Sequence, residues 1–172
     1  MPALPVVLDL RGVPCLVVGA GRVASRKIAA LVRAGARVRV VAPGAAPRVR
    51  TLARRGRLVW VRSRYRRGGL GGARLVVAAT SDRGVNREVA REAKRRGRFV
   101  NVVDDPDLCS LLFPAVLARG PLLLSVSTSG ASPALARALR DELAKRYGPE
   151  YGAYVRLVAT LRRRLRGAAG PR

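Results

Sequence analysis

The sequence predicts an α/β fold with a doubly wound parallel sheet. Short runs rich in Val and Leu alternate with amphipathic segments over residues 13–104, and such alternation is typical of parallel strands joined by helices. A glycine-rich turn follows the first run, and after "DDPD" at 104–107 the alternation gives way to two neighbouring strand-like runs. We therefore expect a main domain over residues 1–112, a smaller region over 113–148 and a helical tail over 149–172.

Each predicted strand of the main domain is a short apolar run rich in β-branched residues. These runs are residues 13–18, 36–43, 57–61, 74–80 and 98–104. Helices are expected over 21–34, 46–55 and 82–97, where apolar residues recur at helical spacing and a glycine ends the pattern. The inward positions are Ala24, Ile28, Leu31 and Val32 in the first helix, and Val85, Val89 and Ala93 in the third. The Gly- and Arg-rich segment 62–73 is predicted to be a loop.

The residues after Leu112 predict a hairpin and two helices. The runs 111–118 and 121–128 are joined by the tight "RGP", which favours a hairpin. Ser132 is the expected N-cap of the next helix, Pro133 its first residue, and its inward stripe is Leu135, Leu139 and Leu143. A last helix over 149–165 carries Tyr154, Leu157, Val158 and Leu161. Because so small a region buries little area alone, we expect residues 113–148 to dimerise and the chain to be a homodimer.

Arginine dominates the charge of the chain. The formal net charge is +25, with 35 basic residues, of which only Lys27, Lys94 and Lys145 are lysines. Arginine binds phosphate and carboxylate groups with a planar fork, so nucleic acid, an anionic membrane surface and a small polyanionic ligand are candidate partners. A purely compositional origin of the charge is an equal alternative. The basic segments 62–69 and 162–167 lack a docking motif and have almost no aromatic residues, which argues against nucleic acid.

Other features of the composition narrow the chemistry. The chain has no histidine, which removes the commonest general base and transition-metal ligand. Cys15 and Cys109 lie far apart in no CxxC motif, and the start of the chain does not resemble a secretory leader, so we expect reduced thiols and a cytoplasmic location. The longest apolar runs, 13–20 and 111–118, are too short to cross a bilayer, so no membrane span is predicted.

Gly19, Gly21 and Ala24 form a G-x-G-x-x-A motif between the first strand and the first helix. The first glycine permits a tight turn, the second lets the backbone approach a pyrophosphate, and the small third residue lets helix and strand pack closely. This context predicts a Rossmann-like NAD(P)-binding domain. The acid that usually holds the ribose of NAD is absent from "VVAPGAAPRVR" at 40–50, which leaves NADP as an alternative, with Arg48 or Arg50 meeting its 2′-phosphate.

Two further clusters carry possible chemistry. Asp104 follows the fifth strand at the sheet edge where ligands bind, next to Asp105 and near Asp107, and a carboxylate there could accept a proton. The same "DDPD" is also favourable turn chemistry, which is the alternative. In "SVSTSGASP" at 125–133, capping needs only Ser132, so the surplus of hydroxyls is suited to holding an anionic group at the start of a helix.

Three segments together resemble the precorrin-2 dehydrogenase and sirohydrochlorin ferrochelatase family, which includes the N-terminal part of sirohaem synthase. They are "VGAGRVASRK" at 18–27, "NVVDDP" at 101–106 and "SVSTSGASP" at 125–133. The resemblance implies NAD-dependent oxidation of precorrin-2 to sirohydrochlorin, with insertion of Fe2+ to give sirohaem as an optional second activity. It also implies a dimer with a nucleotide-binding domain, a dimerisation region and a helical tail.

The resemblance assigns roles to individual residues. It implies that Asp104 is catalytic, and it assigns no residue as a metal ligand. The cofactor-binding residues that it implies are Gly19, Gly21, Arg22, Val23, Pro43, Gly44 and Thr80. The implied tetrapyrrole-binding residues are Asn101, Ser127, Thr128, Ser129, Gly130 and Ser132.

The chain departs from the family pattern in having Asp105 where a small residue is common, Thr128 where some members have serine, and no histidine. The absent histidine bears on the second activity, because a metal path would then depend on Asp104, Asp105 or the substrate. The rival hypothesis is a Rossmann-like module that senses a dinucleotide and binds nucleic acid through a basic face.

Overall fold

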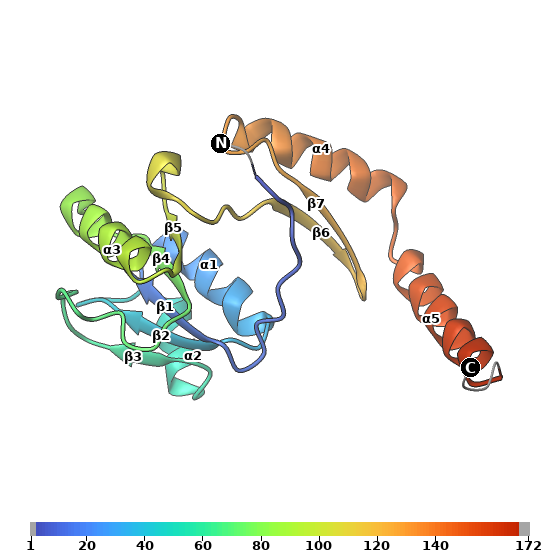
Figure 1. Ribbon diagram of the computed structural model, residues 1–172, viewed down its shortest axis with the longest axis horizontal. Helices are drawn as coiled ribbons and strands as arrows, with labels where there is room; N and C mark the ends of the chain where they lie inside the picture. The colour runs from blue at the N-terminus through green and yellow to red at the C-terminus, as the bar shows by residue number, and fades with distance from the viewer. Residues whose placement is uncertain (1–2, 169–172) are drawn as a thin grey trace. The chain divides into compact units, whose positions relative to one another are not determined.

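The computed structural model describes residues 3–168, and these residues divide into two compact units, one that ends at Leu112 and one that begins at Phe113. The first unit contains the larger sheet and the second contains a hairpin and two helices (Figure 1). Residues 1–2 of the predicted main domain and 169–172 of the predicted tail lie outside the described residues. The roles assigned to the three predicted segments stay predictions.

The first unit is built on a parallel five-stranded sheet in the order β3-β2-β1-β4-β5. Its strands are β1 (Pro14–Val18), β2 (Arg37–Val41), β3 (Val59–Val61), β4 (Leu75–Ala78) and β5 (Phe99–Val102). The helices are α1 (Arg22–Arg33), α2 (Pro47–Arg54) and α3 (Arg83–Arg95). The predicted doubly wound α/β fold is therefore confirmed. The strand order reverses between β1 and β4, and such a switch point is where open α/β sheets bind ligands.

Helices cover both faces of this sheet. Right-handed crossovers from β1 through α1 to β2, and in the opposite direction from β4 through α3 to β5, place α1 and α3 on opposite faces (Figure 1). The predicted inward residues Ile28 and Leu31 of α1 are fully buried, as is Val89 of α3. On the α3 face, the core includes Leu16 and Val76 from neighbouring strands.

Local signals in the sequence fix the helix boundaries. The Asp82 side chain caps α3 by accepting hydrogen bonds from the N–H groups of Gly84 and Val85. Gly35 follows α1 with φ +78°, a left-handed conformation that glycine adopts without a Cβ penalty. A side-chain cap therefore sets the start of α3, and a glycine sets the end of α1.

The second unit contains a β-hairpin and two helices. The hairpin strands are β6 (Ala115–Arg119) and β7 (Leu122–Val126), and the helices are α4 (Pro133–Arg146) and α5 (Glu150–Ala168). The predicted hairpin is confirmed, but its first strand begins at Ala115 and not at residue 111. The reason is that residues 110–111 bond to β5: the N–H groups of Ser110 and Leu111 both donate to the Val100 carbonyl.

The predicted inward stripe of α4 is wrong. Leu135 and Leu139 are 50% and 38% exposed, whereas Ala136 is 6% exposed and Leu143 is half-buried. The small Ala136 permits close packing of α4 on the hairpin. Arg119 of β6 fixes the other end of the helix, since its Nε donates to the carbonyl of Tyr147 over 3.0 Å. The two leucines are left on the outer face of the helix.

Helix α5 begins against the hairpin turn and then presents apolar residues to solvent. A Cβ on Gly152 would lie 3.0 Å from the carbonyl oxygen of Arg119, so the absent side chain permits this close approach. Farther along, the exposed apolar residues are Tyr154, Leu157, Val158, Leu161 and Leu165. Among residues 3–168, no helix combines the length and the apolar character that a membrane crossing requires.

Candidate functional site

The turn between β1 and α1 lies at the switch point and depends on Gly19. Gly19 has φ +102°, and a Cβ placed on it would lie 2.7 Å from the carbonyl carbon of Ala79, which follows β4. Its N–H donates to the Val41 carbonyl at the end of β2 over 2.9 Å. Gly19 therefore packs the turn against the ends of the two strands that flank β1.

Gly21 is a glycine for a different reason. It is the N-cap of α1 with an extended backbone that any residue adopts, and a Cβ built on it meets nothing within 4 Å. Packing within the described protein does not require glycine here, whereas close approach of a ligand does. No side chain caps α1, so its first N–H groups remain available to an anion. The backbone from Gly19 to Gly21 and the free N–H groups at the start of α1 form an open cradle, which fits the pyrophosphate of a dinucleotide.

The start of α1 completes the turn. Ala24 is fully buried and lets the helix pack closely on the sheet. Arg22 is exposed and Val23 is half-buried, so both lie at the rim of the cradle. The exposed guanidinium of Arg22 adds positive charge beside the helix N-terminus, where anions are already favoured.

Thr80 lies across the switch point from Gly19, and its hydrogen bonds join the turn after β4 to the first turn of α3. Its N–H donates to Asn86 Oδ1 over 3.1 Å, and the Asn86 amide nitrogen donates to the Thr80 carbonyl over 3.0 Å. Thr80 therefore shapes the wall of the cradle. Asn86, which is 6% exposed, was missed by the sequence reasoning. The signal in the sequence that could have identified Asn86 is its position in the first turn of the helix predicted after the fourth strand.

The end of β2, where the ribose acid is missing, exposes Pro43 and Gly44. The Ala42 carbonyl just before them accepts a 3.0 Å hydrogen bond from Trp60 Nε1, and the Arg62 guanidinium lies 4.4 Å from the centre of the Trp60 ring. Arg48 and Arg50, the residues considered for a 2′-phosphate, are both exposed on α2. The surroundings of this strand end are thus cationic.

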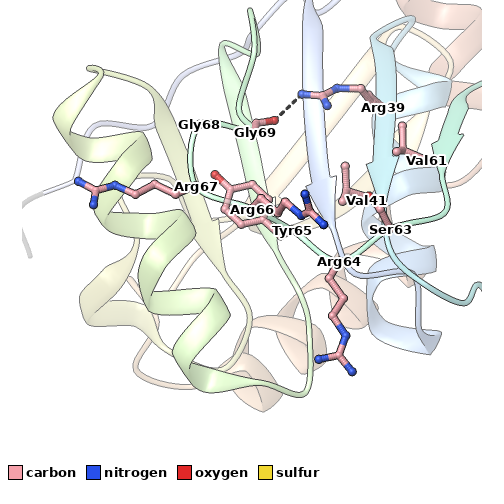
Figure 2. Close-up of a pocket in the computed structure, with 10 residues that line it drawn as sticks. All are labelled: Arg39, Val41, Val61, Ser63, Arg64, Tyr65, Arg66, Arg67, Gly68 and Gly69. Atoms are coloured by element: carbon pink, nitrogen blue, oxygen red, sulfur yellow. Dashed lines mark hydrogen bonds between the residues drawn. The ribbon is translucent and has the colours of Figure 1, made fainter.

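A hollow of about 320 Å³ adjoins the carboxyl ends of β2 and β3. Figure 2 shows its lining residues, which are Arg39, Val41, Val61, Ser63 and the loop 64–69. Arg39 Nη2 donates to the Gly69 carbonyl over 2.7 Å and holds this loop against the sheet. The hollow shares no lining residue with the predicted cofactor set. Apart from its arginines, no pattern in the sequence predicts it.

A buried carboxylate anchors the same loop to α3. Glu92 is 2% exposed and accepts hydrogen bonds from Tyr65 Oη over 2.6 Å and from the Gly68 N–H over 3.0 Å. Arg96 pairs with it over 3.2 Å. Burial alone would raise the pKa of Glu92, but these hydrogen bonds and the neighbouring arginines hold it below its usual value. The anchored loop forms one wall of the hollow.

Asp104 lies just beyond the carboxyl end of β5, at the ligand-binding edge of the sheet. It is exposed and has φ +60°, a left-handed conformation that is uncommon for a residue with a side chain. Aspartate is one of the few residues with a side chain that adopt this conformation in turns, so turn chemistry accounts for it as well, while backbone strain of this kind also clusters at functional sites. An exposed carboxylate there can accept a proton from a bound ligand.

Asn101 is directed into the protein. It is 6% exposed, and its Nδ2 donates to the Leu111 carbonyl over 3.0 Å. This bond holds the chain that returns from Asp104 along β5. A direct contact of Asn101 with substrate stays a prediction, and the structure gives its amide nitrogen a supporting role.

The hydroxyl-rich loop before α4 belongs to the second unit. Thr128 Oγ1 accepts from the Ser132 N–H over 2.9 Å, and Ser127 Oγ accepts from the Ser129 N–H over 3.1 Å. Ser132 caps α4 as predicted, since its Oγ accepts from the Leu135 N–H over 3.2 Å. Each hydroxyl still has its own proton to donate. With Ser129 and Gly130 both exposed, this loop can offer several donors to carboxylates.

Side chains that could bind a metal are not clustered in the described part of the chain. Over residues 3–168, no group of three or more Cys, Asp or Glu side chains is placed so that it could hold a metal ion.

The doubly wound sheet, the glycine turn and the open cradle at Gly21 define a nucleotide-binding protein of the Rossmann class. A family model described as "Putative NAD(P)-binding" matches residues 6–115, and one described as "Sirohaem biosynthesis protein central" matches residues 119–146. The chain belongs to this family of NAD(P)-binding proteins of sirohaem biosynthesis.

Individual relatives agree with this assignment. The chain is 48% identical to a sirohaem synthase of Methylococcus capsulatus over 98% of its own length and 35% of that protein. It is 48% identical to sirohaem synthase 1 of Cronobacter sakazakii over 83% of its length and 30% of that protein. The chain thus spans about a third of these relatives. Among solved structures it is similar to SirC, a precorrin-2 dehydrogenase, with a TM-score of 0.81 and 31% identity, covering 92% of this chain and 78% of SirC.

Proposed function

We propose that the chain oxidises precorrin-2 to sirohydrochlorin with NAD+. The observation that carries the proposal is the open cradle at Gly21, at the switch point of a fold similar to that of SirC, a precorrin-2 dehydrogenase. The cradle accounts for a dinucleotide, and the relatives supply the class of substrate. The similarity to sirohaem synthases lies within the third of their length that this chain spans.

The cofactor is held by the first unit. Gly19 and Gly21 bring the backbone to the pyrophosphate, the start of α1 at Arg22 and Val23 donates to it, and Thr80 forms the opposite wall. Pro43 and Gly44 border the adenosine ribose. When bound, NAD+ accepts a hydride from a ring carbon of the substrate.

Asp104 is the proposed catalytic residue. Loss of a hydride to the cofactor must be matched by loss of one proton, so that two hydrogens leave the macrocycle and NADH and a proton are formed. The Asp104 carboxylate, exposed at the carboxyl edge, accepts that proton. The carboxylate arms of the tetrapyrrole accept hydrogen bonds from the loop before α4, namely from Ser127, Thr128, Ser129, Gly130 and Ser132. Asn101 supports the turn on the substrate side.

The test is an anaerobic assay of the purified protein with precorrin-2 and NAD+. The reaction is monitored through the absorption of sirohydrochlorin. Formation of sirohydrochlorin with a matching yield of NADH is expected. Absence of oxidation with either NAD+ or NADP+ overturns the proposal.

NAD is the proposed cofactor in preference to NADP. The exposed Arg48 and Arg50 on α2 are the residues available to a 2′-phosphate. If NADP+ is used, Arg48→Ala and Arg50→Ala will raise the KM for NADP+ and leave that for NAD+ unchanged. If NAD+ is the cofactor, neither variant will alter its KM.

Insertion of Fe2+ into sirohydrochlorin is proposed as the second activity, with iron as a substrate. The macrocycle supplies the ring nitrogens, and the carboxylates at 104 and 105 assist loss of the pyrrole protons. Adding Fe2+ to the finished dehydrogenase reaction tests this activity. If sirohaem forms no faster than it does without the protein, the second activity is refuted and the oxidation is unaffected.

We further propose a homodimer that acts in the cytoplasm. The outer face of α4 and the exposed apolar residues of α5 favour burial against a second copy. Cys15 and Cys109 are both free and buried, in keeping with a reducing compartment.

A further inference from the structure

The turn that presents Asp104 is strained and needs a tether. Asp104 has φ +60° between β5 and the short 3-10 turn η1 (Pro106–Leu108). The left-handed conformation costs a residue with a Cβ about 1 kcal/mol, so it persists only where the surroundings hold it. The contacts made on either side of Asp104 therefore decide where its carboxylate lies.

One side chain contacts both flanks of this turn. Cys109 Sγ accepts a hydrogen bond from the Val102 N–H over 3.1 Å, at the end of β5. The same sulfur lies 3.3 Å from the Val102 carbonyl and 3.3 Å from the Asp105 carbonyl, to either of which its proton can be donated. Val102 precedes Asp104 by two residues and Asp105 follows it directly. The thiol thus spans the turn from one side to the other.

The thiol is suited to this role because it is buried and protonated. Cys109 is 5% exposed, and burial raises its pKa, so it remains a donor at neutral pH. Asn101 Nδ2 approaches the sulfur at 3.6 Å from the strand. Lys94 adds an outer tether by donating to the Asp107 carbonyl over 3.3 Å. Of these contacts, only those of Cys109 reach both flanks of Asp104.

We infer that Cys109 is a positioning residue, which fixes the Asp104 carboxylate through hydrogen bonds to Val102 and Asp105. The inference rests on the proposed function, since Asp104 acts there as the base. Cys109 is buried and lies outside the sets of residues proposed to bind cofactor and substrate. Its effect should appear in kcat and not in the binding of NAD+.

The test compares Cys109→Ala and Cys109→Ser with Cys15→Ala. Cys15 is 1% exposed in β1, so its variant loses a thiol of similar burial without touching the turn. Displacing a catalytic group by about 1 Å costs up to about a hundredfold in rate, so Cys109→Ala is expected to lower kcat about ten- to a hundredfold with an unchanged KM for NAD+. Cys109→Ser, whose hydroxyl can make both bonds, should restore most of the rate.

A second readout does not depend on activity. In the protein without ligands, amide exchange at Val102 should be faster in Cys109→Ala and return toward wild type in Cys109→Ser. If the alanine variant does not fold, the isosteric Cys109→Val, which lacks both bonds, carries the same expectations.

The outcomes separate the two proposals. Wild-type kcat in Cys109→Ala, or an equal fall in kcat in Cys15→Ala, overturns the positioning role and leaves the proposed function intact. A wild-type protein that does not oxidise precorrin-2 overturns the proposed function and the catalytic meaning of the tether together, whatever the exchange rate at Val102.

Discussion

A Cβ on Gly19 would lie 2.7 Å from the carbonyl carbon of Ala79 and closer still to its oxygen. Two strand ends, β1 and β4, therefore meet through backbone atoms at the point where the strand order reverses. A Cβ on Gly21, two residues farther along the chain, would meet no protein atom within 4 Å. The two glycines of one motif thus serve different purposes, and this difference can be measured.

Gly19→Ala should destabilise the fold. The substitution forces a methyl group into the Ala79 carbonyl and places alanine at φ +102°. Overpacking and backbone strain together are expected to lower the free energy of unfolding by about 3 kcal/mol. Urea denaturation measures it, and a loss of less than about 0.5 kcal/mol would show that the turn relaxes freely.

Gly21→Ala should affect the cofactor instead. The new methyl group meets no protein atom within 4 Å but occupies the space proposed for the pyrophosphate. We expect a change in stability of about 1 kcal/mol or less and NAD+ binding at least about tenfold weaker. Calorimetric titration with NAD+ provides the measurement, with unfolding of the same sample as its control. Unchanged affinity would place the cofactor elsewhere.

Asp104→Gly should separate stability from activity. Glycine adopts φ +60° without a Cβ penalty, so the free energy of unfolding should be equal or higher by up to about 1 kcal/mol. Loss of the base should lower the rate of precorrin-2 oxidation about 10²- to 10⁴-fold. Asp104→Asn should lose the rate as well, while Asp107→Asn, which removes a nearby exposed carboxylate, should retain it. Full activity in both Asp104 variants would leave the aspartate with turn chemistry alone.

Glu92→Gln should weaken the protein in a pH-dependent way. The pKa of Glu92 is lower in the folded protein than usual, so its stabilisation is complete above the unfolded value of about 4.3 and is lost as the pH falls through the folded value. At pH 7 the variant should lose about 2 kcal/mol, because Tyr65 and Gly68 lose a charged acceptor. Thermal unfolding between pH 3 and 7 should show the gap to wild type closing below pH 4.

Glu88→Gln is the matched control for Glu92, because it removes the same charge from α3 without removing the acceptor of Tyr65 and Gly68. An equal loss of stability in this control, or a gap at Glu92 that does not vary with pH, would contradict the assigned role of the buried carboxylate.

The exposed leucines of α4 provide a test of the dimer. The double substitution Leu135→Gln and Leu139→Gln removes apolar surface that a second copy would cover, so the sedimentation coefficient should fall to that of a monomer. Ala134→Gln and Ala138→Gln, exposed at the same spacing on α4, should leave the dimer intact. A wild-type protein that sediments as a monomer at micromolar concentration would refute the homodimer directly.

Much of the fold could be predicted because local patterns specify it. The apolar runs that became β1 and β4 are buried on both faces, as parallel strands require, and the spacing of Ile28 and Leu31 specified the inner face of α1. The α4 stripe failed because its inner face was decided by what the helix packs against. Ala136 lies toward the hairpin and Arg119 fixes the end of the helix, and neither relationship can be read from the spacing of leucines.

By itself, the sequence determined the alternation of strands and helices, the glycine turn and the capping of α4 by Ser132, because each is set by residues close together in the chain. It also determined the resemblance that singled out Asp104, because that resemblance rests on three short motifs. Only the tertiary structure decided that Gly19 meets Ala79, that Asn101 is directed inward, and that Cys109 bridges the flanks of Asp104. These relationships arise where the chain folds back on itself. The residues that they join lie apart in the sequence, and the residue type at one position does not indicate which distant residue it will contact.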